Sequence, residues 1–244
     1  MIVLSVGMPR AGSGWYYNLT HDLIVASGGQ DARLIRRRYL LQRVLTEVNC
    51  NIGTLSTPRL AAVCIPAFLG NTFVIKAHAG PSPAVRRLIE RGIIRPTYIY
   101  RDPRDAMLSA YENGKRALQA GRPNAFSDLA DFQASLEFML AYVRIWEDWT
   151  ACDRALHVRY EDLLVHYDRE VERLAIFLEM DVKPASMADV VERYRPSRVE
   201  IIQKGLHFQQ GRTGRFREKW TPEQQAVLGE YFGPYLARMG YSLD

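Results

Sequence analysis

The stretch Ser5-Val6-Gly7-Met8-Pro9-Arg10-Ala11-Gly12-Ser13-Gly14-Trp15 decides the fold of this chain. An apolar run over residues 1–6 leads into it and predicts a short buried strand, and residues 16–27 after it predict a helix. Glycines let the backbone of such a turn approach a ligand closely, and the N-terminus of the following helix favours an anion. The stretch therefore predicts a P-loop-like strand–loop–helix that binds phosphate.

One position of the loop separates it from the usual nucleotide-triphosphate loop. Gly7 and Gly12 fit the pattern G-x-x-x-x-G-K-[ST], but Ser13 stands where that pattern has lysine. The nearest cation is Arg10, inside the loop. We interpret the loop as a phosphate site of another kind, and the alternative is a tight strand–helix turn that binds nothing.

Length and composition indicate an ordinary globular protein. The 244 residues suit one α/β domain over residues 1–244, and 48% of them are hydrophobic and 24% charged. Three widely spaced cysteines predict reduced thiols in a cytoplasmic protein rather than a disulfide framework or a zinc site. No apolar run is long enough to span a membrane, and the N-terminus lacks the basic region of a signal peptide.

The net charge of +5 is unevenly distributed. Residues 33–43 hold five arginines and no acid, and residues 204–219 hold five basic residues against one acid. Such clusters suit either a nucleic-acid binder or an enzyme that surrounds a polyanionic cofactor with positive charge. The repeated aromatic and basic residues of a single-strand binding platform are absent, so we expect no nucleic-acid partner.

Strand-like and helix-like segments alternate along the chain, which predicts a single α/β domain with a central parallel sheet flanked by helices on both faces. Strands are expected over residues 1–6, 72–77, 96–100 and 155–160. Helices are expected over residues 16–27, 32–48, 58–69, 83–91, 103–118, 129–149, 162–180, 184–194 and 221–239, and a long functional loop over residues 204–219.

Polar side chains follow every expected strand. Ligands of open α/β sheets bind at the carboxyl ends of the strands, which share one edge of the sheet. The residues that follow the four strands in order are Arg10 and Trp15, Lys76 and His78, Arg101 and Ser109, and Tyr160. We therefore expect these side chains to gather in one site.

Two of these segments resemble motifs of the sulfotransferases that use 3′-phosphoadenosine 5′-phosphosulfate (PAPS). The loop from Pro9 to Trp15 resembles their 5′-phosphosulfate loop, with Arg10 in the place of a lysine. Residues 98–111 resemble their 3′-phosphate motif, which implies that Arg101 and Ser109 grip that phosphate. An arginine fork at a strand end suits bidentate phosphate contact.

Two further segments extend the resemblance to nearly the whole chain. Lys76-Ala77-His78 is similar to the Lys-Thr-His segment that supplies the catalytic base of the family. Residues 207–217 are similar to the loop that closes over the cofactor, but Gln209 and Gln210 replace its basic pair and Phe216 replaces its tryptophan. Arg212 and Arg217 are the candidates for the missing charge.

The resemblance implies a cytoplasmic, metal-independent transferase that moves a sulfuryl group from PAPS to a hydroxyl or amine. His78 would be the general base, and Lys76 and Arg10 would stabilise the leaving phosphate. The cofactor-binding set implied is Arg10, Ala11, Gly12, Ser13, Gly14, Trp15, Arg101, Ser109, Tyr160, Gln210, Gly211 and Arg212.

The acceptor is expected to be a small molecule, a glycan or a lipid-like compound, bound by residues 33–69 and 114–131. Two alternatives stay open at this point. One is a nucleotide-dependent phosphotransferase of related fold, and the other is a module that binds a nucleotide or RNA without chemistry. Nothing in the sequence indicates the oligomeric state.

Overall fold

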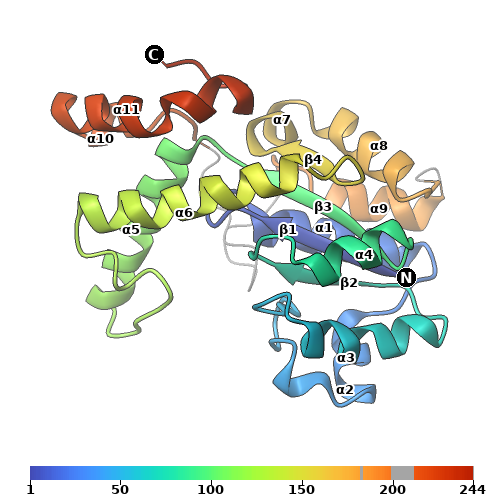
Figure 1. Ribbon diagram of the computed structural model, residues 1–244. Helices are drawn as coiled ribbons and strands as arrows, with labels where there is room; N and C mark the ends of the chain where they lie inside the picture. The colour runs from blue at the N-terminus through green and yellow to red at the C-terminus, as the bar shows by residue number, and fades with distance from the viewer. Residues whose placement is uncertain (182–183, 199–211, 244) are drawn as a thin grey trace.

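The computed structural model describes residues 1–181, 184–198 and 212–243. In these residues, four parallel strands form one sheet in the order β2-β1-β3-β4 (Figure 1). The strands are β1 (Ile2–Gly7), β2 (Phe73–Ala77), β3 (Ile94–Tyr100) and β4 (Leu156–Arg159). The predicted parallel sheet is confirmed.

Helices cover both faces of this sheet. One face carries α1 (Ser13–Ala26), α8 (Tyr167–Phe177) and α9 (Ala185–Arg193), and the other carries α4 (Pro83–Glu90) and α6 (Phe132–Thr150) (Figure 1). Because β1 lies between these layers, all six of its residues are buried, which explains its nearly continuous apolar sequence.

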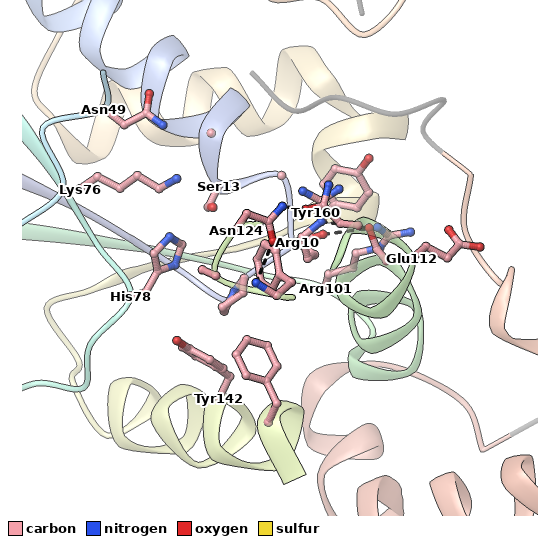
Figure 2. Close-up of a pocket in the computed structure, with 18 of the residues that line it drawn as sticks. Arg10, Ser13, Asn49, Lys76, His78, Arg101, Glu112, Asn124, Tyr142 and Tyr160 are labelled. Carbon is pink, nitrogen blue, oxygen red and sulfur yellow. Dashed lines mark hydrogen bonds between the residues drawn. The ribbon is translucent and has the colours of Figure 1, made fainter. Parts of the chain in front are cut away.

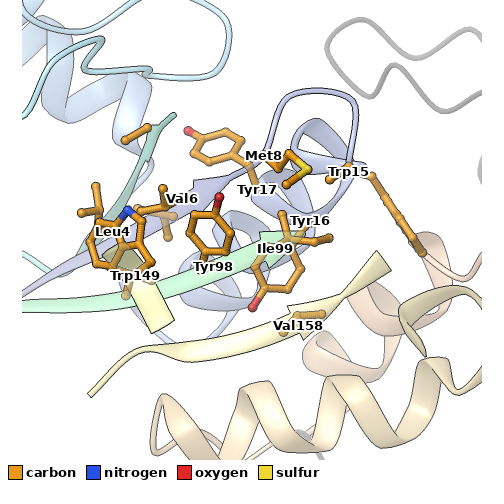
Figure 3. Packing of buried hydrophobic residues seen from close by; sticks show 14 of the residues in the cluster. Leu4, Val6, Met8, Trp15, Tyr16, Tyr17, Tyr98, Ile99, Trp149 and Val158 are labelled. Carbon is orange, nitrogen blue, oxygen red and sulfur yellow. The ribbon is translucent and has the colours of Figure 1, made fainter. Parts of the chain in front are cut away.

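Large side chains from the strands and both helix layers form the core (Figure 3). Trp15 of α1 and Trp149 of α6 are among the largest fully buried residues. The core members drawn around β1 and β3 include Leu4, Val6, Met8, Tyr16, Tyr17, Tyr98, Ile99 and Val158.

The remaining helices follow clear start signals. Side chains of Asp31, Asp102 and Asp131 cap α2, α5 and α6, and Thr221 forms a capping box with Gln224 at the start of α11. The bounds are α2 (Ala32–Arg38), α3 (Thr57–Phe68), α5 (Pro103–Gln119), α7 (Tyr160–Val165), α10 (Phe216–Lys219) and α11 (Pro222–Met239). None of the helices in the described ranges is both long and apolar enough to cross a membrane.

Three expected elements were wrong. The helix expected over residues 32–48 ends at Arg38, because Leu40 adopts a left-handed conformation with φ 53°. The helix expected over residues 162–180 is two helices that meet at His166, which has non-helical angles. Part of the loop expected over residues 204–219 is the short helix α10, and residues 204–211 lie outside the described residues.

Candidate active site

A cavity of about 690 Å³ opens at the carboxyl edge of the sheet (Figure 2). The β1–α1 loop, the end of β2, Arg101 after β3, the middle of α5 and Tyr160 after β4 all contribute to it, as the strand-end pattern predicts. Its lining includes Arg10, Gly12, Ser13, Gly14, Asn49, Asn51, Lys76, His78, Arg101, Ser109, Glu112, Asn113, Arg116, Asn124, Phe126, Phe138, Tyr142, Tyr160, Arg212 and Arg215.

The β1–α1 loop has backbone angles at position 12 that glycine adopts without strain. Gly12 has φ 73°, and a Cβ there would lie 2.7 Å from the ring of Tyr160. Arg10 also adopts a left-handed conformation, with φ 64°, which is uncommon for a residue with a side chain. The first hydrogen bond within α1 runs from Tyr16 N to Gly12 O. The backbone N–H groups before Tyr16 therefore have no partner within the helix and can bind an anion in the cavity.

Arg10 lies inside this loop and contacts the motif on α5. Its Nε donates to the Oγ of Ser109 at 3.1 Å. Since that oxygen accepts, the Ser109 hydroxyl hydrogen is free to be donated to a ligand. Burial, followed by the nearby Arg116 and Arg101, lowers the pKa of Arg10 to about 10, so the group stays charged at neutral pH.

Arg101 directly follows β3 and lies against the β1–α1 loop, where its Nη1 donates to the carbonyl of Arg10 at 3.4 Å. Its guanidinium is 4.8 Å from the centre of the Tyr160 ring and donates to the carbonyl of Arg212 at 2.8 Å. Its Nε is buried and finds no acceptor among the described residues. A buried donor in this state fits an anionic ligand, because such groups are almost always hydrogen-bonded.

Two carboxylates that the sequence analysis missed hold residues 212–216 against α5. Asp105 accepts from the backbone N–H groups of Gly214 at 2.6 Å and Phe216 at 3.1 Å. Glu112 pairs with Arg215 through two contacts of 2.7 and 3.0 Å. These contacts bring Arg212 to the cavity. Asp105 could have been found, because it stands four residues after Arg101, at the spacing of helical neighbours.

Lys76 lies near the end of β2 and His78 directly follows this strand, and both side chains line the cavity (Figure 2). The Nδ1 of His78 lies 2.5 Å from the carbonyl of Gly7, which can only accept, so Nδ1 carries the proton. The Nε2 lone pair is therefore free for chemistry. Burial and the neighbouring Lys76 lower the pKa of His78 to about 4, and the bond to Gly7 opposes this shift. Burial and Arg10 lower the pKa of Lys76 to about 8.

Asn49 and Asn51 are further cavity residues that the sequence did not single out. They stand on a segment that joins the edge of β2 through bonds from Ile52 N to Lys76 O and from Lys76 N to Cys50 O. The Oδ1 of Asn49 is buried without a partner among the described residues. No local pattern predicts this placement, because it depends on pairing with a strand that is distant in sequence.

The basic residues of the region around 33–43 support this segment. Arg33 donates to the carbonyl of Val48 at 3.1 Å, and Arg36 donates to the carbonyl of Leu45 at 2.7 Å. Arg59 adds a bond of 2.6 Å to the carbonyl of Ile52. Part of the arginine cluster therefore holds the backbone beside the cavity.

Some of the predicted site residues do not reach the cavity with their side chains. Trp15 is fully buried, donates to the carbonyl of Tyr194 at 2.9 Å and stacks on Tyr167. The side chain of Ala11 is also buried. Gln210 and Gly211 lie outside the described residues.

The parallel sheet, the glycine-bearing loop and the surrounding cations define an α/β protein of the P-loop-like class with a site for a polyanion. A family model described as the sulfotransferase domain matches residues 73–240. The chain is 22% identical to Sulfotransferase 6B1 of Danio rerio over 263 residues, covering 99% of this chain and 82% of that protein. The chain therefore belongs to the sulfotransferase family and is a transferase.

Solved structures show the same fold. Mouse sulfotransferase SULT7A1 complexed with PAP matches with a TM-score of 0.60 and 16% identity, covering 97% of this chain and 84% of that chain. Retinol dehydratase in complex with androsterone and inactive cofactor PAP matches with a TM-score of 0.60 and 15% identity, covering 96% and 80%. At these identities the likeness concerns the fold.

Proposed function

We propose that the cavity binds PAPS and that the chain transfers its sulfuryl group to the hydroxyl or amine of a small acceptor. The observation that carries the proposal is a continuous row of anion-binding groups in one cavity. The row runs from the first turn of α1 through Arg10, which bonds to Ser109, to Arg101, which contacts the carbonyl of Arg10. A nucleotide with a 3′-phosphate and a 5′-phosphosulfate carries two anionic groups that such a row can bind.

The residues present fit this donor. The buried Nε of Arg101 has no acceptor among the described residues, so a ligand oxygen can accept its hydrogen bond. Glycine at position 12 lets the ring of Tyr160, another lining residue, pack directly on the phosphate loop. When bound, PAPS supplies the sulfuryl group and leaves as adenosine 3′,5′-bisphosphate (PAP), the molecule in the two solved relatives above.

The roles of the chain's own residues follow from their positions. His78 Nε2 accepts the proton of the acceptor hydroxyl, while the bond from Nδ1 to Gly7 holds the ring in place. Lys76 and Arg10 supply positive charge beside the leaving phosphate, in a site where burial strengthens their effect. The proposal includes a metal-independent reaction, because arginine and lysine provide this charge.

The proposal also includes a small-molecule, glycan or lipid-like acceptor and a cytoplasmic location. Both segments expected to bind the acceptor contribute cavity residues, Asn49 and Asn51 from one and Asn124 and Phe126 from the other. Retinol dehydratase, which shares the fold, was solved with androsterone. The three cysteines are free thiols, as in a reducing compartment.

Calorimetry with two nucleotides tests the donor site. We expect PAP to bind at least about tenfold more tightly than adenosine 5′-monophosphate, because a charge-assisted contact contributes about 1.5–3 kcal/mol. Arg101→Ala should remove most of this difference. Arg144→Ala, which replaces an exposed arginine of α6 outside the cavity, is the matched control. Equal affinity of the wild type for both nucleotides would contradict the assignment of Arg101 and Ser109.

The pH dependence of kcat/KM tests the catalytic groups of the free enzyme. Protonation of His78 removes the base, so activity should fall as the pH drops through about 4. Deprotonation of Lys76 removes a cation, so activity should also fall as the pH rises through about 8. Lys76→Arg should abolish the alkaline limb, because arginine stays protonated. An alkaline limb that persists unchanged in this variant would exclude Lys76 as its source.

A further inference from the structure

A steric contact explains why residue 114, in the middle of α5, is a glycine. A Cβ at this position would lie 2.0 Å from the carbonyl oxygen of Phe126 and 2.6 Å from its carbonyl carbon. Both atoms belong to the backbone, so the contact cannot be relieved by turning a side chain. Glycine is unfavourable in a helix interior, and its use here lets the loop over residues 120–131 pack directly on the helix.

The same loop is fastened beside Gly114 by asparagines. Asn124 Nδ2 donates to the Oδ1 of Asn113, the neighbour of Gly114, at 2.9 Å. The Oδ1 of Asn124 accepts from Phe126 N at 2.9 Å, and Ser127 Oγ accepts from Asn124 N at 2.8 Å. The backbone of Phe126 is thus fixed from two sides.

This arrangement brings the ring of Phe126 into the cavity. The guanidinium of Arg10 lies 5.8 Å from the ring centre. Phe138 meets the Phe126 ring edge to face at 5.9 Å, and Tyr142 meets Phe138 at 4.9 Å. The three rings form an aromatic wall that ends at Tyr142, on the side of the cavity where His78 lies (Figure 2).

We propose that Gly114 is a positioning residue that seats Phe126 in the aromatic wall, and that this wall binds the flat ring of the acceptor alcohol. The inference rests on the proposed function, since it describes the acceptor side of the same cavity. A side chain at position 114 displaces the loop, opens the wall and weakens acceptor binding. Arg10 loses its contact with the Phe126 ring but keeps its bond to Ser109, so nucleotide binding is affected less than acceptor binding. Aromatic side chains favour a ligand with a flat ring, because a pair of rings gains more binding energy than the buried area alone provides.

Binding of 2-naphthol to the PAP-loaded protein, measured by calorimetry, tests the inference. We expect Gly114→Ala and Phe126→Ala each to lower the affinity for 2-naphthol at least tenfold, which corresponds to about 1.4 kcal/mol. The double variant should be no weaker than Phe126→Ala, because Gly114 acts through Phe126. PAP affinity should fall by clearly less than 2-naphthol affinity, because Arg10 keeps its bond to Ser109. Gly229→Ala is the matched control, since it replaces a helical glycine of α11 with open space around it.

Three outcomes overturn the inference. It is wrong if the wild type binds PAP but not 2-naphthol, if Gly114→Ala leaves 2-naphthol binding unchanged, or if the two variants are additive. A wild type that binds 2-naphthol but not PAP counts against the proposed function instead. Should Gly114→Ala fail to fold, Asn113→Ala removes the clasp to Asn124 and should weaken 2-naphthol in the same direction.

Discussion

Replacing His78 with alanine should lower turnover by about 10²–10⁴, the usual contribution of a general base. The imidazole has its Nε2 free because Nδ1 donates to Gly7, and its lowered pKa keeps it neutral and able to accept a proton at physiological pH. PAP affinity should change little, because His78 faces the acceptor side. The measurement is a pair for each variant, turnover of PAPS with an acceptor found by screening and PAP affinity by calorimetry.

His78→Asn separates the base from a structural anchor. The asparagine amide can still donate to the carbonyl of Gly7, but it cannot take a proton. If His78 is the base, both variants should turn over slowly. If His78 is only a structural anchor, asparagine should restore turnover. Near-wild-type turnover in His78→Ala would show that another group or the acceptor itself handles the proton.

The parts of the fold that depend on local pattern were predictable. The apolar run of β1 and the glycines after it determine a strand–loop–helix, and the four strands were expected close to where they lie. The errors came from single residues with non-helical backbone angles inside helix-like patterns. Leu40 takes positive φ and ends α2 early, and His166 interrupts a stretch that is amphipathic throughout. Local propensity carries no signal for such positions.

The site was predictable where residues follow strand ends and not where distant segments meet. Lys76, His78, Arg101 and Ser109 line one cavity because the carboxyl ends of parallel strands share an edge. Asn49, Asn51, Asn124 and Phe126 come from loops whose path is set by long-range contacts, and Phe138 and Tyr142 of α6 complete the aromatic wall. In the sequence, Gly114 is simply an unfavourable residue within a helix. Only the position of the Phe126 backbone explains why glycine is needed there.

Replacing Arg10 with alanine should weaken PAP and slow turnover together, unlike the change at His78. Arg10 stands in the phosphate loop with its guanidinium bonded to Ser109, so it contributes charge both to the bound nucleotide and to the leaving phosphate. Removing one such preorganised donor costs about 10²–10³ in turnover. The same pair of measurements, PAP affinity and PAPS turnover, reads both effects.

Arg10→Lys is the control that isolates charge from geometry. Arginine, lysine and alanine all carry a Cβ, so each meets the same strain at φ 64° and differences among them come from the side chain beyond it. Lysine keeps a positive charge but lacks the planar fork, so it should retain most of the PAP affinity and recover part of the turnover. If Arg10→Ala kept PAP affinity and lost only turnover, charge on the ground-state phosphate would be excluded, and Arg10 would act in the transition state alone.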